Sequence, residues 1–208
     1  MKQARPQGQK DEPLKNFEEL LSPGRNISLQ IQHSLEGLPK SFVVLFIIGV
    51  KEYSETIIEL IRVLRRKNAR GVYLTINKPV EDLAKLFRKE KIETEGIFFI
   101  DAISALSERQ TVDGKTTIFL DSPTDLIEIS NAVSKSLEVC KVDFLIFDSV
   151  STLLLYNKPQ AVEKLMHLLV GKMHSAGIKG FLIVVKSSQN SGIIETLSQF
   201  VDKSIEIA

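Results

Sequence analysis

The sequence has few of the residues on which disulfide scaffolds, metal centres and membrane proteins depend. It contains one cysteine, Cys140, so an internal disulfide is excluded, and its three histidines show no spacing typical of a metal site. The longest apolar run, Phe42–Val50, is about half of the roughly 20 residues that a membrane-spanning helix needs. No signal-peptide pattern is present. We therefore expect a cytoplasmic protein with no metal centre, no membrane partner and a half-buried, unreactive thiol at Cys140.

Net charge is also nearly absent. Lys and Arg number 27 against 26 Asp and Glu, for a formal net charge of +1. Nucleic-acid-binding domains usually present a strongly basic surface, so the composition argues against DNA or RNA as a partner. The short basic cluster at residues 65–67 and Arg70 is typical of a solvated helix end.

The composition changes near residue 16. Residues 1–16 are polar, contain Pro6, Gly8 and Pro13, and carry charges of both signs, which predicts a disordered tail. The rest of the 208-residue chain has the length of one domain with a sizeable core. We expect a single domain over residues 17–208.

Short apolar runs alternate with amphipathic segments through this domain. The runs are continuous and rich in β-branched and aromatic residues, as in strands that are covered on both faces. The predicted strands are Phe42–Ile48, Gly71–Thr75, Gly96–Ile100, Val142–Phe147, Phe181–Val185 and Ser204–Ile207. Helical spacing of apolar residues predicts helices around Ile57–Leu64, Leu83–Phe87, Leu126–Leu137 and Val162–Leu169, the third capped by Ser122 or Thr124. The fold class that follows is α/β: a doubly wound, mostly parallel sheet with helices on both faces.

One segment interrupts the alternation. Residues 104–117 are polar and predict an exposed loop or hairpin, followed by a short extra strand over Thr117–Leu120. The run from Gly114 to Thr117 looks like the end of a phosphate-binding loop. Arg109 stands where the first glycine of that pattern is needed, and no predicted strand leads into the run. We interpret the match as accidental.

The segment after the first predicted strand has the position of a phosphate-binding loop, because a helix follows it at once. The pattern expected there is G-x-x-x-x-G-K-[ST]. Gly49 and Thr56 match its ends, whereas Ser54 replaces the second glycine and Glu55 replaces the lysine. Ser54 disfavours the backbone conformation that glycine permits, and Glu55 repels the phosphates that a lysine attracts. Lys51, in the same loop, is the candidate for partial compensation.

A second candidate lies downstream. The run Phe144–Asp148, followed by Ser149, has the form of a Walker B strand, whose aspartate holds Mg²⁺. The alternative is structural, with Asp148 capping the turn or the segment that follows. Gly49, Lys51, Ser54, Glu55, Thr56 and Asp148 are together the predicted residues of a degenerate nucleotide site.

In this order, the segments resemble the RecA superfamily, and in particular its KaiC-like branch, over residues 16–208. Leu35–Lys40 is similar to the branch's lead-in to the first strand, Phe147–Leu153 to its Walker B segment, Ala176–Val185 to its next strand and Phe200–Glu206 to its closing strand. The resemblance implies a RecA-like P-loop fold whose second strand ends in two glutamates that activate the attacking water. Asn77 and Lys78 stand there in this sequence.

The resemblance and the substitutions together predict a pseudo-ATPase. Our first hypothesis is a non-catalytic regulatory or scaffold protein without a cofactor, which binds its own copies or an active RecA/KaiC-like ATPase. The second is a sensor that binds ATP with Mg²⁺ through Lys51, Thr56 and Asp148 but does not hydrolyse it. The third is a recombinase-paralogue accessory protein acting on DNA, and an active ATPase comes last.

The two charge changes suggest one further hypothesis. Glu55 occupies the family's cationic position and Lys78 one of its anionic positions, so the two side chains are expected to face the same site. We hypothesise that they form an ion pair across it. The alternative is two separate, solvated surface charges.

Overall fold

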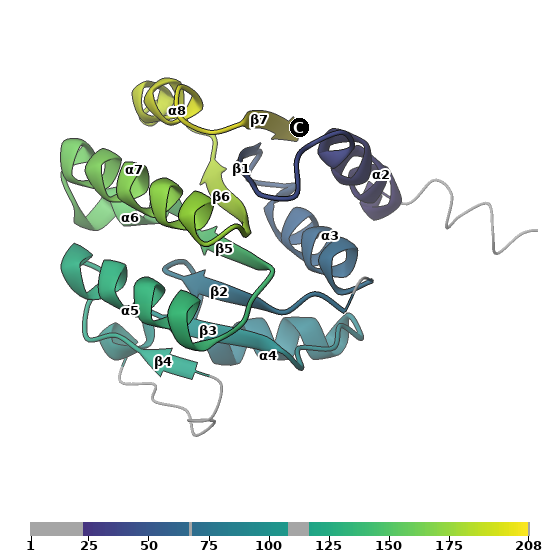
Figure 1. The fold of residues 1–208 in the computed structure, drawn as a ribbon, viewed down its shortest axis with the longest axis horizontal. Helices are drawn as coiled ribbons and strands as arrows, with labels where there is room; N and C mark the ends of the chain where they lie inside the picture. Colours follow the sequence, from purple (N-terminus) through teal and green to yellow (C-terminus); the bar gives the residue numbers. More distant parts are fainter. Residues whose placement is uncertain (1–22, 67, 108–116, 208) are drawn as a thin grey trace, which may run out of the picture.

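The computed structural model describes residues 23–66, 68–107 and 117–207. The predicted tail at residues 1–16 lies outside the described residues, as do Gly114–Thr116 of the run that looks like a phosphate-binding loop. The described residues form a parallel sheet between two layers of helices (Figure 1).

The sheet has seven strands in the described residues, in the order β4-β3-β2-β5-β6-β1-β7, and every neighbouring pair is parallel. Its strands are β1 (Phe42–Ile48), β2 (Gly71–Thr75), β3 (Ile97–Asp101), β4 (Thr117–Phe119), β5 (Phe144–Asp148), β6 (Lys179–Val185) and β7 (Lys203–Ile207). All six predicted runs are strands, and the short extra strand also forms. The expected α/β architecture is confirmed.

Helices cover both faces of the sheet. On one face lie α2 (Pro23–Leu35), α3 (Tyr53–Arg65) and α4 (Val80–Lys89); on the other lie α5 (Leu126–Val139), α6 (Val150–Tyr156), α7 (Pro159–Ser175) and α8 (Ser191–Ser198). The four predicted helices correspond to α3, α4, α5 and α7. The sequence analysis did not predict α2, α6 and α8.

Two apolar cores result, one on each face. Strand β1 is buried along its whole length, and its alternate residues point into different cores: Val43 and Leu45 pack with α7 and α8, whereas Val44 and Phe46 pack with α2 and α3. A strand covered on both faces has no polar side, which explains the continuous apolar runs in the sequence. Each fully buried side chain of this kind contributes about 1.5–3 kcal/mol to folding.

Two local predictions need correction. Helix α5 is capped by Asp125, whose carboxylate accepts the backbone N–H groups of Ile127 and Glu128, and not by Ser122 or Thr124. The Ser122 hydroxyl instead accepts the backbone N–H of Thr124 and bonds to the Thr124 hydroxyl. Of the two alternatives for residues 104–117, an exposed loop or a hairpin, the hairpin is wrong, because β4 runs parallel to β3. This segment begins with a 3₁₀ turn, η1 (Ser104–Ser107), and residues 108–116 lie outside the described part.

The parallel arrangement places the carboxyl ends of all strands at one edge of the sheet, where ligands bind in open α/β folds. Asp148, at the end of β5, lies in register with Thr75 of β2 and Ile183 of β6. β6 separates β5 from β1. This edge therefore brings together the loop after β1, the turn after β2 and the end of β5.

Cys140 is half-buried and free, at the carboxyl end of α5, as expected from the sequence. None of the helices within residues 23–207 that the structure describes has the length and apolar character to cross a membrane.

Candidate functional site

The loop after β1 is short and turns directly into a helix. Gly49, directly after β1, donates its N–H to the carbonyl of Ile207, and α3 already begins at Tyr53. Ser54 therefore lies in the first turn of α3, and none of residues 50–56 has a positive φ. The loop backbone does not adopt the left-handed conformation for which glycine is used in a phosphate-binding loop.

The side chains of this loop are turned towards the protein itself. The Glu52 carboxylate folds back over Gly49, so that a Cβ atom added to Gly49 would lie 2.1 Å from Glu52 Oε2. The buried Thr56 hydroxyl donates to the Glu52 carbonyl at 2.8 Å, as does the Thr56 N–H. Lys51 is exposed. Thr56 is fully buried, so its side chain faces the interior of the protein and not an open phosphate site.

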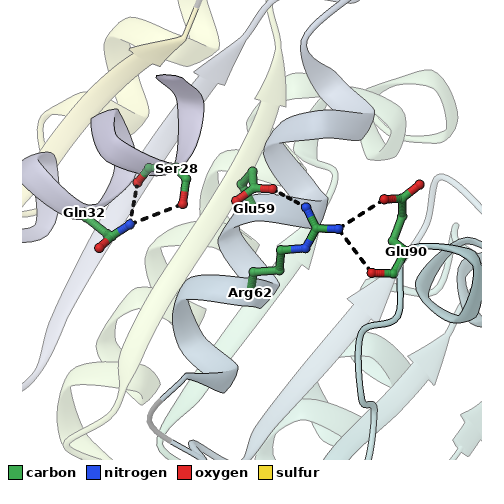
Figure 2. A network of polar contacts seen from close by, with 5 residues as sticks. All are labelled: Ser28, Gln32, Glu59, Arg62 and Glu90. Carbon is green, nitrogen blue, oxygen red and sulfur yellow. Dashed lines mark hydrogen bonds and ion pairs between the residues drawn. The ribbon is translucent and has the colours of Figure 1, made fainter. Parts of the chain in front are cut away.

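Glu55 faces helix α2 and not the carboxyl edge of the sheet. A Cβ atom on Gly24 would lie 2.1 Å from Glu55 Oε1. Partial burial raises the pKa of the Glu55 carboxyl, and the neighbouring Glu59 carboxylate raises it further. The nearby Arg62 is already held by Glu59 and by Glu90, 3.1 Å away, in the network that Figure 2 shows.

The hypothesised ion pair between Glu55 and Lys78 does not form, since these two described residues share no salt bridge. The Lys78 ammonium lies over the ring of Tyr53 instead, 5.4 Å from its centroid. Glu55 is drawn away by its packing against α2, a helix that the sequence analysis did not anticipate. The hypothesis is wrong for this reason.

Asp148 is the centre of a buried polar cluster. Its Oδ2 accepts hydrogen bonds from the hydroxyls of Tyr53 and Tyr73, each at 2.5 Å, and its Oδ1 has no hydrogen-bond partner. Asp148 and Tyr73 are fully buried and Tyr53 nearly so. We call these three residues the tyrosine–aspartate cluster. The capping alternative for Asp148 is wrong, because Ser149 caps α6 by accepting the N–H of Thr152.

Burial controls the protonation of the cluster. It raises the pKa of Asp148 to about 6, although the two tyrosine hydroxyls and the positive charge of Lys78 act in the opposite direction. Burial and the adjacent Asp148 also raise the pKa of both tyrosines, which stay protonated and donate. At neutral pH the cluster is a buried carboxylate held by two neutral hydroxyls.

The turn after β2 lies beside this cluster. The Thr75 hydroxyl donates to the carbonyl of Lys78 at 2.6 Å and accepts the Lys78 N–H at 3.2 Å, which closes the turn. Asn77 accepts a hydrogen bond from the Thr152 hydroxyl at 3.3 Å. Asn77 and Lys78 thus take part in the hydrogen bonds that fix this turn and join it to α6.

The structure brings some of the predicted site residues together and separates others. Asp148 and Lys78 meet at the same edge, whereas Glu55 points away and Thr56 is committed within its helix. Sequence reasoning missed Tyr53 and Tyr73. The available signal was a tyrosine two residues before the end of a strand adjacent to the Asp148 strand, together with a tyrosine at the start of the helix after β1.

A cavity of about 670 Å³ opens next to the cluster at the same edge of the sheet. Its walls come from the loop after β1, from α6, from the start of α7 and from the segment between β6 and α8. We call it the crevice. Its described lining residues are Val50, Tyr53, Asn77, Ser151, Thr152, Leu154, Leu155, Pro159, Glu163, Val185, Ser187, Gln189, Asn190, Gly192 and Ile193. Among the described residues, no group of three or more His, Cys, Asp or Glu side chains is placed to hold a metal ion.

Comparisons with known proteins agree with this architecture. The solved structure of the KaiC-like protein PH0186 from the hyperthermophilic archaeon Pyrococcus horikoshii superposes with a TM-score of 0.60, covers 83% of this chain and 74% of its own, and is 12% identical in sequence. At that identity the likeness concerns the fold, which is RecA/KaiC-like, as the sequence resemblance implied. No curated protein matches the sequence. A family model described as "Family of unknown function (DUF7504)" matches residues 60–207, most of the chain, and the protein therefore belongs to that family.

Proposed function

We propose that this protein is a non-catalytic RecA/KaiC-like regulatory or scaffold subunit, a pseudo-ATPase that acts by binding a protein partner. The observation that carries the proposal is the tyrosine–aspartate cluster. Asp148 stands at the position of a magnesium-binding aspartate, yet two tyrosine hydroxyls occupy its Oδ2 inside the protein. One of them belongs to Tyr53, in the first turn of the helix that would bind phosphate.

ATP with Mg²⁺ is the ligand that the fold family implies, and the residues present do not fit it. The loop after β1 places the Glu52 carboxylate over Gly49, and Glu55, at the position of the phosphate-binding lysine, is turned towards α2, so no cation stands there. A like-charge contact at about 4 Å, at an effective dielectric near 20, costs roughly 4 kcal/mol. The Thr56 side chain is fully buried. These features support a degenerate Walker A loop.

The residues that would activate water are also unsuited to that task. Asn77 is neutral and Lys78 is cationic, so neither accepts a proton from water near neutral pH as a carboxylate does. Loss at both the binding loop and the water-activating position favours the pseudo-ATPase over the ATP sensor. For the partner, the proposal retains both forms: further copies of this chain, or an active RecA/KaiC-like ATPase.

Titration calorimetry with ATP and Mg²⁺ tests the proposal. We expect no heat of binding at micromolar ATP and no phosphate release in a coupled assay, with an active RecA-type ATPase measured alongside as the positive control. Micromolar affinity that Asp148→Asn abolishes would replace the proposal with the sensor. Turnover that the same variant abolishes would replace it with an active enzyme.

A further inference from the structure

The crevice beside the tyrosine–aspartate cluster has the size and position of a ligand site. Its volume, about 670 Å³, lies within the range of roughly 300–1,000 Å³ that is typical of small-molecule pockets. It opens at the carboxyl ends of parallel strands, the edge at which open α/β sheets bind ligands.

A single negative charge lines the described part of the crevice. Of the described residues that line it, Glu163 is the only one that is charged at neutral pH, and neither Lys nor Arg is among them. Glu163 is half-buried in the second turn of α7 and makes no hydrogen bond or ion pair with another described residue. A phosphate or carboxylate ligand would meet repulsion here, whereas an organic cation would find an unpaired carboxylate.

The exposed part of the crevice lining is apolar, and a polar residue in its wall is already hydrogen-bonded within the protein. Leu155 and Val50 stand at the mouth with 77% and 75% of their surface exposed. The polar wall residue Asn190 is already satisfied, because its Nδ2 donates to the Val185 carbonyl at 2.7 Å and its Oδ1 accepts the Ser187 N–H at 3.0 Å. The polar groups of Asn190 are thus engaged within the protein, whereas the Glu163 carboxylate is free to pair with a ligand.

We infer that the crevice binds a small organic cation, an amine or a guanidinium that carries an apolar group. Its charged end pairs with the Glu163 carboxylate, and its apolar part covers Leu155 and Val50. A guanidinium suits the site best because it forms two parallel hydrogen bonds to a carboxylate. The inference goes beyond the proposed function, which concerns ATP and a protein partner.

Titration of the full chain with three probes of similar length tests the charge preference. The probes are hexylguanidinium, hexylamine and hexanoate, followed by ligand-observed NMR or calorimetry. We expect the two cations to bind, hexylguanidinium more tightly, and hexanoate to bind at least tenfold more weakly than either. Equal binding of hexanoate and hexylguanidinium would overturn the inference.

Two variants locate the binding. Glu163→Gln should weaken hexylguanidinium at least tenfold, whereas Glu138→Gln should leave it unchanged, because Glu138 lines a separate cavity between α5 and α7. Leu155→Ser should weaken hexylguanidinium more than methylguanidinium, which lacks the apolar chain. An unchanged affinity in Glu163→Gln, with a normal melting curve, would refute the assignment. None of these results depends on whether ATP binds, so this inference and the proposed function fail separately.

Discussion

Two polar regions lie side by side at the carboxyl edge of the sheet. They differ in the burial and in the hydrogen-bond partners of their carboxylates. In the tyrosine–aspartate cluster the carboxylate is fully buried and held by two hydroxyls. In the crevice the Glu163 carboxylate is half-buried, faces a cavity, and has no described partner. The Asp148 carboxylate is thus used within the protein, whereas the Glu163 carboxylate is available to a ligand.

The difference separates stability from binding. A buried carboxylate raises or lowers the free energy of unfolding according to its hydrogen bonds and protonation, so the cluster is expected to dominate the pH dependence of folding. An unpaired carboxylate at a cavity contributes little to folding and much to ligand choice.

The largest effect is expected from protonation of Asp148. Its pKa is about 6 in the folded protein and lies near 3.8 in the unfolded chain, so between those values the folded state holds a proton that the unfolded state has released. Stability therefore falls as the pH rises from about 4 to 6, by about 3 kcal/mol at most, and stays lower above pH 6. Urea unfolding at a series of pH values measures this. Asp148→Asn should lack this fall, and a fall of equal size in the variant would contradict the assignment to Asp148.

Loss of one hydroxyl from the cluster should have the next largest effect. Tyr73→Phe removes a donor from a buried carboxylate and should lower the free energy of unfolding at pH 7.5 by about 2 kcal/mol. Tyr156→Phe is the matched control, because Tyr156 is 39% exposed and lies outside the cluster, and it should change stability by less than about 0.5 kcal/mol. Similar values for the two variants would mean that the cluster does not hold Asp148 as described.

The smallest effect is expected in the crevice. Glu163→Gln should change the free energy of unfolding by less than about 0.5 kcal/mol, because the side chain forms no internal pair to lose. Chemical denaturation at pH 7.5 is the measurement. A loss above about 1 kcal/mol would show that Glu163 serves the fold and would remove the contrast between the two regions.

The strands of the sheet were largely predictable from the sequence. Where a predicted strand boundary differs from the observed one, the cause is local. β1 and β2 match their predicted bounds, Phe42–Ile48 and Gly71–Thr75. Ser41 precedes the first apolar run and Arg70 the second, and Gly49 ends the first. The third strand was predicted to begin at Gly96, but this glycine has a φ of +80° and forms the turn before β3. β6 begins earlier than predicted, at Lys179, because pairing with Phe42 and Phe144 extends it through residues of low strand propensity.

The site was predictable only in part. Sequence spacing correctly singled out Asp148 and the loop after β1 as neighbouring parts of one edge. The direction of Glu55 depended on α2, which packs against α3 but was not predicted, so spacing could not reveal it. The roles of Tyr53 and Tyr73 depended on side-chain reach across strands. The periodicity of apolar residues does not indicate which side chains on different strands and helices meet.

The place of β7 in the sheet has a consequence for biosynthesis. β1 is an interior strand whose outer neighbour is β7, the last strand of the described chain, and the carbonyl of Ile207 receives the N–H of Gly49. While the polypeptide is still emerging from the ribosome, the backbone groups on one side of β1 stay unpaired until residues 203–207 have been released. Newly made chains that are truncated just before β7 would keep that open side, which invites strand pairing between molecules.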